Sequence, residues 1–325
     1  KYIIESLKHW MVDYHVNGFR FDLMGLHEIE TMKEIYAALK EIDSNVMVYG
    51  EPWTGGISEV RNGITSETKK KIDQMEGVGM FNDDIRNAIK GAEFGGFQHG
   101  FVQGVYEDNE GRDLITAVCT GLTGSQNLTT EPGRSLNYVE CHDNFTLFDK
   151  LAMSYLGETK RKSSEGNLLA DLMKATDDKI LKDAVTTDIT ALEMVKAQNK
   201  MCAAIVFLAQ GTPFINGGQE FMRTKQGDEN SYKSDDEINQ IDLGLKDTYN
   251  DVYKVYKGLI ALRKANSDAF GANAEANAER ATEDGSVIKY TTGYTKVVDV
   301  TSGAVKDSTT LPTVVGAKNF VILKK

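Results

Sequence analysis

A strand–helix–strand pattern near the start of the chain limits the possible folds more than any other part of the sequence. Phe19, Phe21 and Leu23 alternate with polar residues, which is the two-residue period of a strand. Apolar residues recur at helical spacing over 29–42, and a short apolar strand follows at 46–49. Two strands joined by a helix within about 30 residues form a βαβ unit, so we expect the two strands to be parallel neighbours.

The alternation of strands and helices continues along the chain. Further strands are predicted at 78–81, 136–139 and 213–216. Further helices are predicted from about residue 85, at 192–209 and at 251–264. The predicted strands end in polar residues, which favours an α/β fold of the (β/α)8 TIM-type barrel, whose active site is built at the carboxyl ends of the strands. A doubly wound open sheet is the competing architecture, but the sequence lacks a glycine-rich dinucleotide-binding fingerprint.

Two segments depart from this alternation. Residues 157–190 are rich in charged side chains and are predicted to form a helical insertion on the surface. From about Ser267, short β-rich runs are separated by Gly, Ser, Thr and Asp, which is typical of a small antiparallel β-sandwich domain. We therefore expect a partial catalytic barrel over 1–266, which carries the insertion, and a C-terminal β domain over 267–325.

Composition argues against several classes of function. The chain has 37 Lys and Arg against 48 Asp and Glu, and its net charge of -11 argues against a nucleic-acid partner. No run of about 18 apolar residues occurs, so we expect no membrane-spanning helix. The 3 cysteines fit neither a disulfide framework nor a zinc ribbon. A phosphate-cradling glycine loop, which would favour phosphoryl transfer, is also lacking.

Three carboxylates follow predicted strands: Asp22, Glu51 and Asp143. Arg20 lies on the same strand face as Asp22 and would keep that carboxylate ionised, as a nucleophile requires. Trp53 would reduce the hydration of Glu51 and favour its protonated form, as a general acid requires. Such a pair of carboxyl groups is what cleavage of a glycosidic bond uses. Taken singly, each residue is better explained by a helix cap, a turn or a structural ion pair.

The sequence around these carboxylates resembles a known family. Gly-Phe-Arg-Phe-Asp at 18–22, Tyr-Gly-Glu-Pro-Trp at 49–53 and Glu-Cys-His-Asp-Asn at 140–144 resemble three of the four signature motifs of the α-amylase superfamily of glycoside hydrolases. The flanking sequence, most distinctively 211–243, narrows the resemblance to type I pullulanases, which cleave α-1,6 branch linkages. The resemblance extends over most of residues 1–265.

The resemblance implies roles for individual residues. Asp22 matches the nucleophile, Glu51 the acid/base and Asp143 the stabiliser of the transition state. Contacts with the nucleophile or with bound glucose units are implied for Arg20, Trp53, His142, Asn144, Asp228, Asn230 and Tyr232. No cofactor is implied, and calcium binding is not readable from this sequence.

The resemblance also implies that part of the parent protein lies outside this chain. In the family, a fourth motif and the first barrel strands precede the helix predicted near residues 3–14. We therefore expect the chain to contain about strands 4–8 of the barrel. Its expected protein partner is the missing N-terminal part of the same protein, which would supply the other strands. The predicted function is a retaining hydrolase of α-1,6 branches in pullulan, starch or glycogen-type α-glucans, inactive as the isolated chain. The alternatives are a non-catalytic glucan-binding fragment and an α-1,4-acting, amylase-type hydrolase; the cellular compartment stays open.

Overall fold

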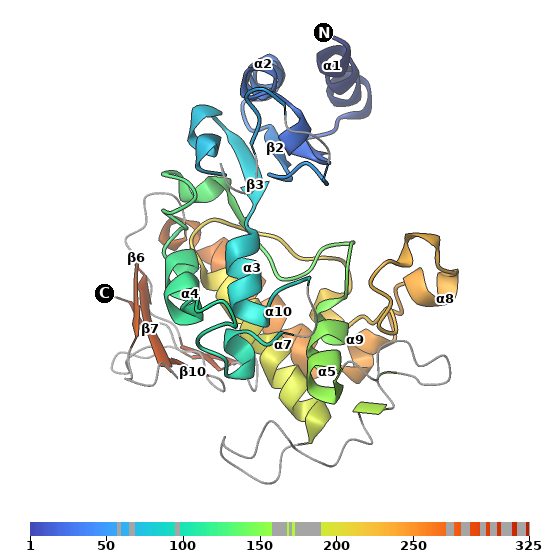
Figure 1. Cartoon of the computed structure of the whole chain (residues 1–325), viewed down its shortest axis with the longest axis vertical. Helices are drawn as coiled ribbons and strands as arrows, with labels where there is room; N and C mark the ends of the chain where they lie inside the picture. The colour runs from blue at the N-terminus through green and yellow to red at the C-terminus, as the bar shows by residue number, and fades with distance from the viewer. Residues whose placement is uncertain are drawn as a thin grey trace. The chain divides into compact units, whose positions relative to one another are not determined.

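The structure is a computed structural model that describes residues 1–56, 60–64, 69–94, 98–157, 168, 171–172 and 190–270, and 6 short strands between 276 and 324 (Figure 1). The chain forms two compact units. The first consists of 1–82, 124–137 and 210–212, and the second of the other residues. Each unit has its own hydrophobic core.

A sheet with the strand order β1-β2-β3-β4-β5 organises the first unit. Its strands are β1 (Gly18–Phe21), β2 (Met47–Gly50), β3 (Val78–Phe81), β4 (Ser135–Asn137) and β5 (Thr212–Pro213). The pairs β1–β2, β2–β3 and β3–β4 are parallel, which confirms the parallel pairing predicted from the βαβ pattern. Because the strands are parallel, their carboxyl ends lie along one edge of the sheet.

In the described part of the first unit, these strands are accompanied by the α-helices α1 (Tyr2–Tyr14) and α2 (Ile29–Lys40). On α2, a single stripe is buried, made of Ile29, Met32, Ile35 and Leu39. This stripe joins residues of β2 and β3 in one core. Ile42, which the sequence pattern placed on the same apolar side, is 42% exposed because the helix ends at Lys40. Short 3-10 helices are η1 (Met24–Leu26), η2 (Lys69–Gln74) and η4 (Pro132–Arg134).

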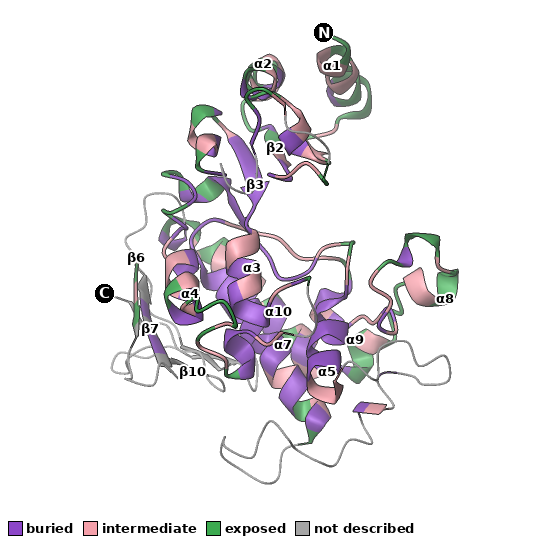
Figure 2. Ribbon diagram, viewed as in Figure 1, coloured by how far each residue is buried: buried purple, intermediate pink, exposed green. Residues whose placement is uncertain are grey.

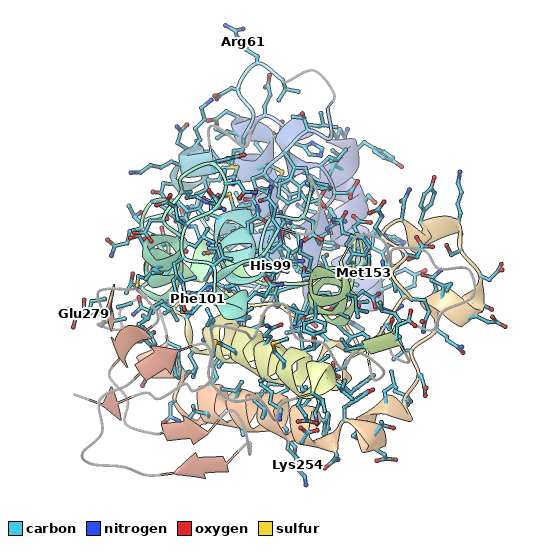
Figure 3. The ribbon with its side chains drawn as sticks, turned by 60° about the horizontal axis from the view of Figure 1, so that its bottom comes forward. Arg61, His99, Phe101, Met153, Lys254 and Glu279 are labelled. Atoms are coloured by element: carbon cyan, nitrogen blue, oxygen red, sulfur yellow. The ribbon has the colours of Figure 1, made fainter. Side chains whose placement is uncertain are left out.

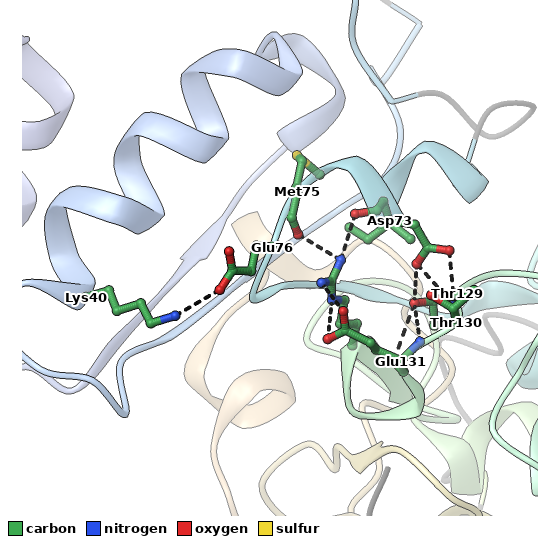
Figure 4. Close-up of polar contacts among 9 residues, drawn as sticks. Lys40, Asp73, Met75, Glu76, Thr129, Thr130 and Glu131 are labelled. Atoms are coloured by element: carbon green, nitrogen blue, oxygen red, sulfur yellow. Dashed lines mark hydrogen bonds and ion pairs between the residues drawn. The ribbon is translucent and has the colours of Figure 1, made fainter. Parts of the chain in front are cut away.

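Buried Arg134 ties the segment before β4 to the end of η2. Its guanidinium donates to two backbone carbonyl oxygens there, at 2.9 and 3.0 Å, and pairs with Glu131 at 2.5 Å (Figure 4). Beside it, the carboxylate of Asp73 accepts the hydroxyl of Thr129 at 2.7 Å and the N–H of Thr130 at 3.1 Å (Figure 4). These bonds hold the segment before β4 in place at the point where the chain enters the sheet.

The second unit is mainly helical. Its longer helices are α3 (Asp83–Lys90), α4 (Leu114–Leu122), α5 (Leu147–Leu156), α7 (Ala191–Leu208) and α10 (Asn250–Ala265). Its shorter ones are η3 (Phe101–Gln103), η7 (Gln219–Phe221), η8 (Ser231–Lys233), α8 (Asp236–Asn239), α9 (Leu245–Thr248) and η9 (Ser267–Ala269). Most of α7 is buried, and this helix packs against α5 and α10 (Figure 2). Phe101 and Met153 lie in the same core (Figure 3).

Short strands end the chain. β7 (Val287–Thr292) pairs antiparallel with β6 (Ala276–Arg280) and β10 (Val314–Gly316), and parallel with β11 (Leu323–Lys324). β8 (Val297–Asp299) pairs antiparallel with β9 (Ala304–Lys306) in a separate sheet. The larger sheet is therefore mixed and not wholly antiparallel, because β11 runs in the same direction as β7.

A buried tyrosine connects these strands to the helices of the second unit. The side chain of Tyr290, on β7, is fully buried. Its hydroxyl group lies 3.2 Å from the carbonyl oxygen of Leu122 and 2.9 Å from that of Leu208, at the ends of α4 and α7. The strands and helices therefore share one core, to which Ile288 also belongs.

Two further sequence predictions concern the second unit and the sheet. The insertion expected near 157–190 lies mainly outside the described residues. The last barrel strand, expected over 213–216, is limited to Thr212–Pro213. In the part of the chain that the structure describes, no helix has the length and apolar character that a membrane span would need.

Candidate active site

The pairing of β1 with β2 brings Asp22 and Glu51 to the same edge of the sheet. Phe21 and Gly50 are the last partners in the register of the two strands, so Asp22 and Glu51 follow at equivalent positions. The N–H of Glu51 donates to the carbonyl oxygen of Phe21 at 3.2 Å, which continues the ladder by one bond. Because neighbouring strands lie about 4.8 Å apart, the two carboxyl groups start from adjacent points of the backbone.

Two glycines allow the loops after β1 and β2 to approach each other. A Cβ atom on Gly50 would lie 2.7 Å from the carbonyl oxygen of Phe21, and one on Gly25 would lie 2.6 Å from that of Trp53. Real side chains do not tolerate such contacts with backbone, so both positions require glycine. The half-buried Trp53 is thus fixed near the first loop through its backbone.

Arg20 bridges the two carboxylates. Its Nη1 donates to Oδ1 of Asp22 at 3.0 Å, and its Nη2 donates to Oε1 of Glu51 at 2.5 Å. The other oxygen of Glu51 accepts the N–H of Leu23 at 2.7 Å. Leu23, two residues after the end of β1, takes the left-handed backbone conformation with φ 44°, so the alternation predicted through Leu23 stops there. No sequence pattern predicts the contact from the N–H of Leu23, since every residue except proline carries such a donor.

The two bridged carboxylates lie in different environments. The side chain of Asp22 is 72% exposed, whereas that of Glu51 is 9% exposed. Hydrogen bonds from a guanidinium group and a backbone amide favour the ionised form of a carboxylate. Asp22 is therefore open to a ligand and beside a positive charge, and Glu51 is enclosed and bonded at both oxygens.

His142, Asp143 and Asn144 follow β4 along the chain and belong to the second unit. The side chains of His142 and Asp143 are 59% and 66% exposed, and Nε2 of the imidazole lies 3.5 Å from Oδ2 of the carboxylate. Asn144 has φ 61°, so the loop turns sharply after Asp143. The Sγ atom of Cys141 lies 3.3 Å from Nδ1 of His142. The motif therefore presents polar groups to solvent.

Glu140 lies behind this exposed motif and is buried. Its carboxylate accepts the N–H of Leu147 at 2.8 Å and the side-chain amide of Asn216 at 2.9 Å. Burial raises the pKa of Glu140 to about 7, although both hydrogen bonds act in the opposite direction.

The other predicted substrate residues lie close together in the segment before α8. Asp228 accepts the N–H of Asn230 at 2.9 Å through Oδ1 and the hydroxyl of Ser234 at 2.5 Å through Oδ2. Tyr232 is 72% exposed, and Nζ of Lys233 lies 5.0 Å from the centre of its ring. An exposed aromatic ring beside a polar loop is suited to contact with a sugar.

The predicted site residues thus form two groups. Arg20, Asp22, Glu51 and Trp53 belong to the first unit, and the residues at 142–144 and 228–232 belong to the second. Within the described ranges, no three His, Cys, Asp or Glu side chains are grouped so that they could hold a metal ion.

The first unit has an α/β fold with a parallel sheet and polar residues at the carboxyl ends of its strands, which is where enzymes of this class place their catalytic groups. No family model matches the chain. The pullulanase of Bacillus subtilis is 32% identical over 289 residues, which is 86% of this chain and 34% of that protein. The GlgX homolog of the glycogen operon of Mycobacterium tuberculosis is 28% identical over 280 residues, or 81% of this chain and 34% of that protein.

Solved structures give the same result. A pullulanase from Paenibacillus barengoltzii, in complex with maltohexaose and α-cyclodextrin, is 34% identical and has a TM-score of 0.69, covering 93% of this chain and 41% of that one. A pullulanase from Anoxybacillus, complexed with maltotetraose, is 33% identical with a TM-score of 0.68, covering 92% of this chain and 38% of that one. The chain is therefore a homologue of pullulanases, and it spans about a third of the length of the Bacillus subtilis protein.

Proposed function

We propose that this chain supplies the catalytic carboxylates of a retaining glycoside hydrolase that cleaves α-1,6 linkages in pullulan and related α-glucans. The observation that carries the proposal is the bridge from Arg20 to Asp22 and Glu51, at the ends of neighbouring parallel strands. The homology to pullulanases, two of them solved with maltooligosaccharides, supports an α-glucan as the substrate.

The exposed Asp22 is the proposed nucleophile and the enclosed Glu51 the proposed acid/base. Asp22 would attack the anomeric carbon, while Glu51 protonates the departing glycosidic oxygen. To act as an acid, Glu51 must first take up a proton, which its bond to Arg20 opposes. Substrate binding would therefore have to weaken that bond. Once Asp22 is esterified its charge is lost, and Arg20 then favours the ionised form of Glu51, as the base that activates water in the second step.

The remaining predicted residues complete the proposal. Asp143 would stabilise the transition state, and Trp53, His142, Asn144, Asp228, Asn230 and Tyr232 would contact bound glucose units. We place these residues in part of a (β/α)8 barrel over 1–266, followed by a β domain over 267–325. The parallel pairs β1–β2, β2–β3 and β3–β4 support the barrel. Full activity would need parts of the pullulanases that this chain does not match.

Pullulan hydrolysis tests the proposal. Residues 1–325 and the complete open reading frame in which they occur are purified separately and incubated with pullulan, and the products are separated. We expect maltotriose, the product of α-1,6 cleavage, from the complete protein and little from 1–325 alone. Panose-type products would indicate α-1,4 cleavage instead. Glucan binding without hydrolysis in every preparation would replace the proposal by a binding function.

Variants of the two carboxylates test the assigned roles. Asp22→Asn should abolish hydrolysis, and Asp247→Asn, which changes an exposed aspartate on α9, should not. Glu51→Gln should slow pullulan hydrolysis by roughly 10²–10⁴-fold, as loss of a general acid does. The same variant should be far less impaired on an aryl α-maltotrioside, because its leaving group needs little protonation. Equal losses on both substrates would remove the acid role from Glu51.

A further inference from the structure

Two segments of the second unit carry the residues proposed to contact substrate. The first, which we call the histidine loop, is residues 140–147 and carries His142 and Asp143. The second, which we call the tyrosine segment, is residues 224–232 and ends at Tyr232. Both present exposed side chains, so neither is fixed by burial of its own functional groups.

A buried aspartate holds the start of the tyrosine segment. Asp149 lies in the first turn of α5 and is fully buried. Its Oδ1 accepts the hydroxyl of Thr224 at 2.5 Å, and its Oδ2 accepts the N–H of Lys225 at 2.8 Å. Burial raises the pKa of Asp149, while bonds from Thr224 and from the backbone of Lys225 and Gly227 act against the rise. A buried carboxylate with several donors from one short segment is costly to displace, so it fixes that segment on α5.

The side chain of Lys225 connects this anchor to the histidine loop. Lys225 is 3% exposed, and its Nζ donates to the carbonyl oxygen of His142 at 3.2 Å. Burial lowers the pKa of Lys225, and the nearby carboxyl groups of Asp149 and Glu140 act in the opposite direction. One residue therefore bonds α5 through its backbone and the histidine loop through its side chain.

The contact at His142 lies where the histidine loop leaves the buried interior. The two ends of the loop are already joined, because the carboxylate of Glu140 accepts the N–H of Leu147. Between them, Asn144 takes a left-handed conformation, and the side chains of His142 and Asp143 face solvent. The hydrogen bond from Lys225 thus holds the exposed part of the loop through its backbone.

We propose that Asp149 and Lys225 are positioning residues that hold the histidine loop in register with the tyrosine segment. Through them, the placement of Asp143 depends on the same buried anchor that places Asp228 and Tyr232. The role in catalysis rests on the proposed function, whereas the anchoring itself is a property of the fold and is measurable without substrate.

Cys141 provides the readout for the anchoring. This half-buried thiol lies in the histidine loop next to His142, so its rate of alkylation reports how often the loop opens. Cys119 on α4 is also half-buried and Cys202 on α7 is fully buried, so they report wider unfolding. Residues 1–325 are treated with iodoacetamide under native conditions, and each cysteine peptide is quantified separately by mass spectrometry.

Lys225→Met should speed the alkylation of Cys141 by roughly ten-fold, the order expected for losing a hydrogen bond from a charged group. The rates at Cys119 and Cys202 should stay unchanged. Lys225→Arg, which can still donate to the carbonyl of His142, should restore most of the protection. The matched control is Lys200→Met, which removes a buried lysine on α7 bonded to Asp251 on α10 at 2.7 Å.

Asp149→Ala is the second variant and covers the case that Lys225→Met does not fold. It removes the oxygens that accept from the hydroxyl of Thr224 and the N–H of Lys225, so it should also expose Cys141. An unchanged Cys141 rate in the folded variants, or an equal acceleration in Lys200→Met, would overturn the anchoring.

Hydrolysis of pullulan by the complete protein then tests the positioning role. Lys225→Met should lower kcat with a smaller change in KM, because Asp143 would act on the transition state more than on the bound substrate. Unchanged kcat despite a more reactive Cys141 would overturn the positioning role. Absence of hydrolysis by the wild-type protein would count against the proposed function and not against the anchoring, which the thiol rates decide.

Discussion

Replacing Glu140 with Gln should remove a pH dependence from the stability of this chain. Glu140 is 2% exposed, and its burial raises its pKa from the ordinary 4.5 to about 7. Between these two values, the folded chain keeps a proton on Glu140 that the unfolded chain releases. The free energy of unfolding therefore falls as pH rises from 4.5 to 7, and the contribution of Glu140 is constant above 7.

The size of the effect follows from the difference between the two pKa values. The pKa of Glu140 lies about 2.5 above its ordinary value, and a pKa difference of 1 corresponds to about 1.36 kcal/mol. The whole effect is thus roughly 3 kcal/mol, of which roughly 2 kcal/mol falls between pH 5.5 and 7. Gln has no proton to release in this range, so the variant should lack this term. It keeps a carbonyl oxygen for the N–H of Leu147, and a rotated Asn216 amide can accept from the new amide.

Urea unfolding followed by circular dichroism at pH 5.5 and 7.5 measures the effect. The wild-type chain should lose roughly 2 kcal/mol relative to Glu140→Gln between the two pH values, by the same linkage. Glu237→Gln, at an exposed position on α8, is the control and should follow the wild type. If the difference between wild type and Glu140→Gln were the same at both pH values, burial would not hold a proton on Glu140, and the reasoning would fail.

Three further substitutions test individual contacts of the fold. In urea titrations, Asp113→Ala should lower the free energy of unfolding by about 1 kcal/mol, because the carboxylate of Asp113 caps α4 by accepting two backbone N–H groups at 3.0 Å. Asp113→Asn should be nearly neutral, and equal losses of stability in the two variants would exclude capping. Tyr290→Phe should cost about 1–3 kcal/mol in the same titrations, since carbonyl oxygens of α4 and α7 lose a buried contact, and a neutral result would show that the hydroxyl group does not hold the strands. Gly25→Ala places a Cβ atom 2.5 Å from the carbonyl oxygen of Ile64, so it should disturb the loop after β1 and lower the rate of pullulan hydrolysis. The control Gly133→Ala, where a Cβ atom meets open space, should keep that rate, and full activity of Gly25→Ala would contradict the close approach.

Local sequence pattern determined the first strand–helix–strand unit. The spacing of apolar residues within one helix or strand shows which side faces the core, and a few consecutive residues are enough to recognise it. It therefore predicted α1, α2 and the parallel pairing of β1 with β2, and located β3 at 78–81. Because the carboxyl ends of parallel strands share an edge, it also predicted that Asp22 and Glu51 would be neighbours.

Contacts between distant segments follow from the three-dimensional fold and not from local sequence pattern. The pattern placed Arg20 beside Asp22, but the second bond of Arg20, to Glu51, depends on the register of β1 against β2. The left-handed turn at Leu23, like the parallel pairing of β11, has no local signal because each is imposed by segments far away in the chain. The bond from Lys225 to His142 joins residues 83 positions apart, and its strength comes from burial that no local pattern encodes.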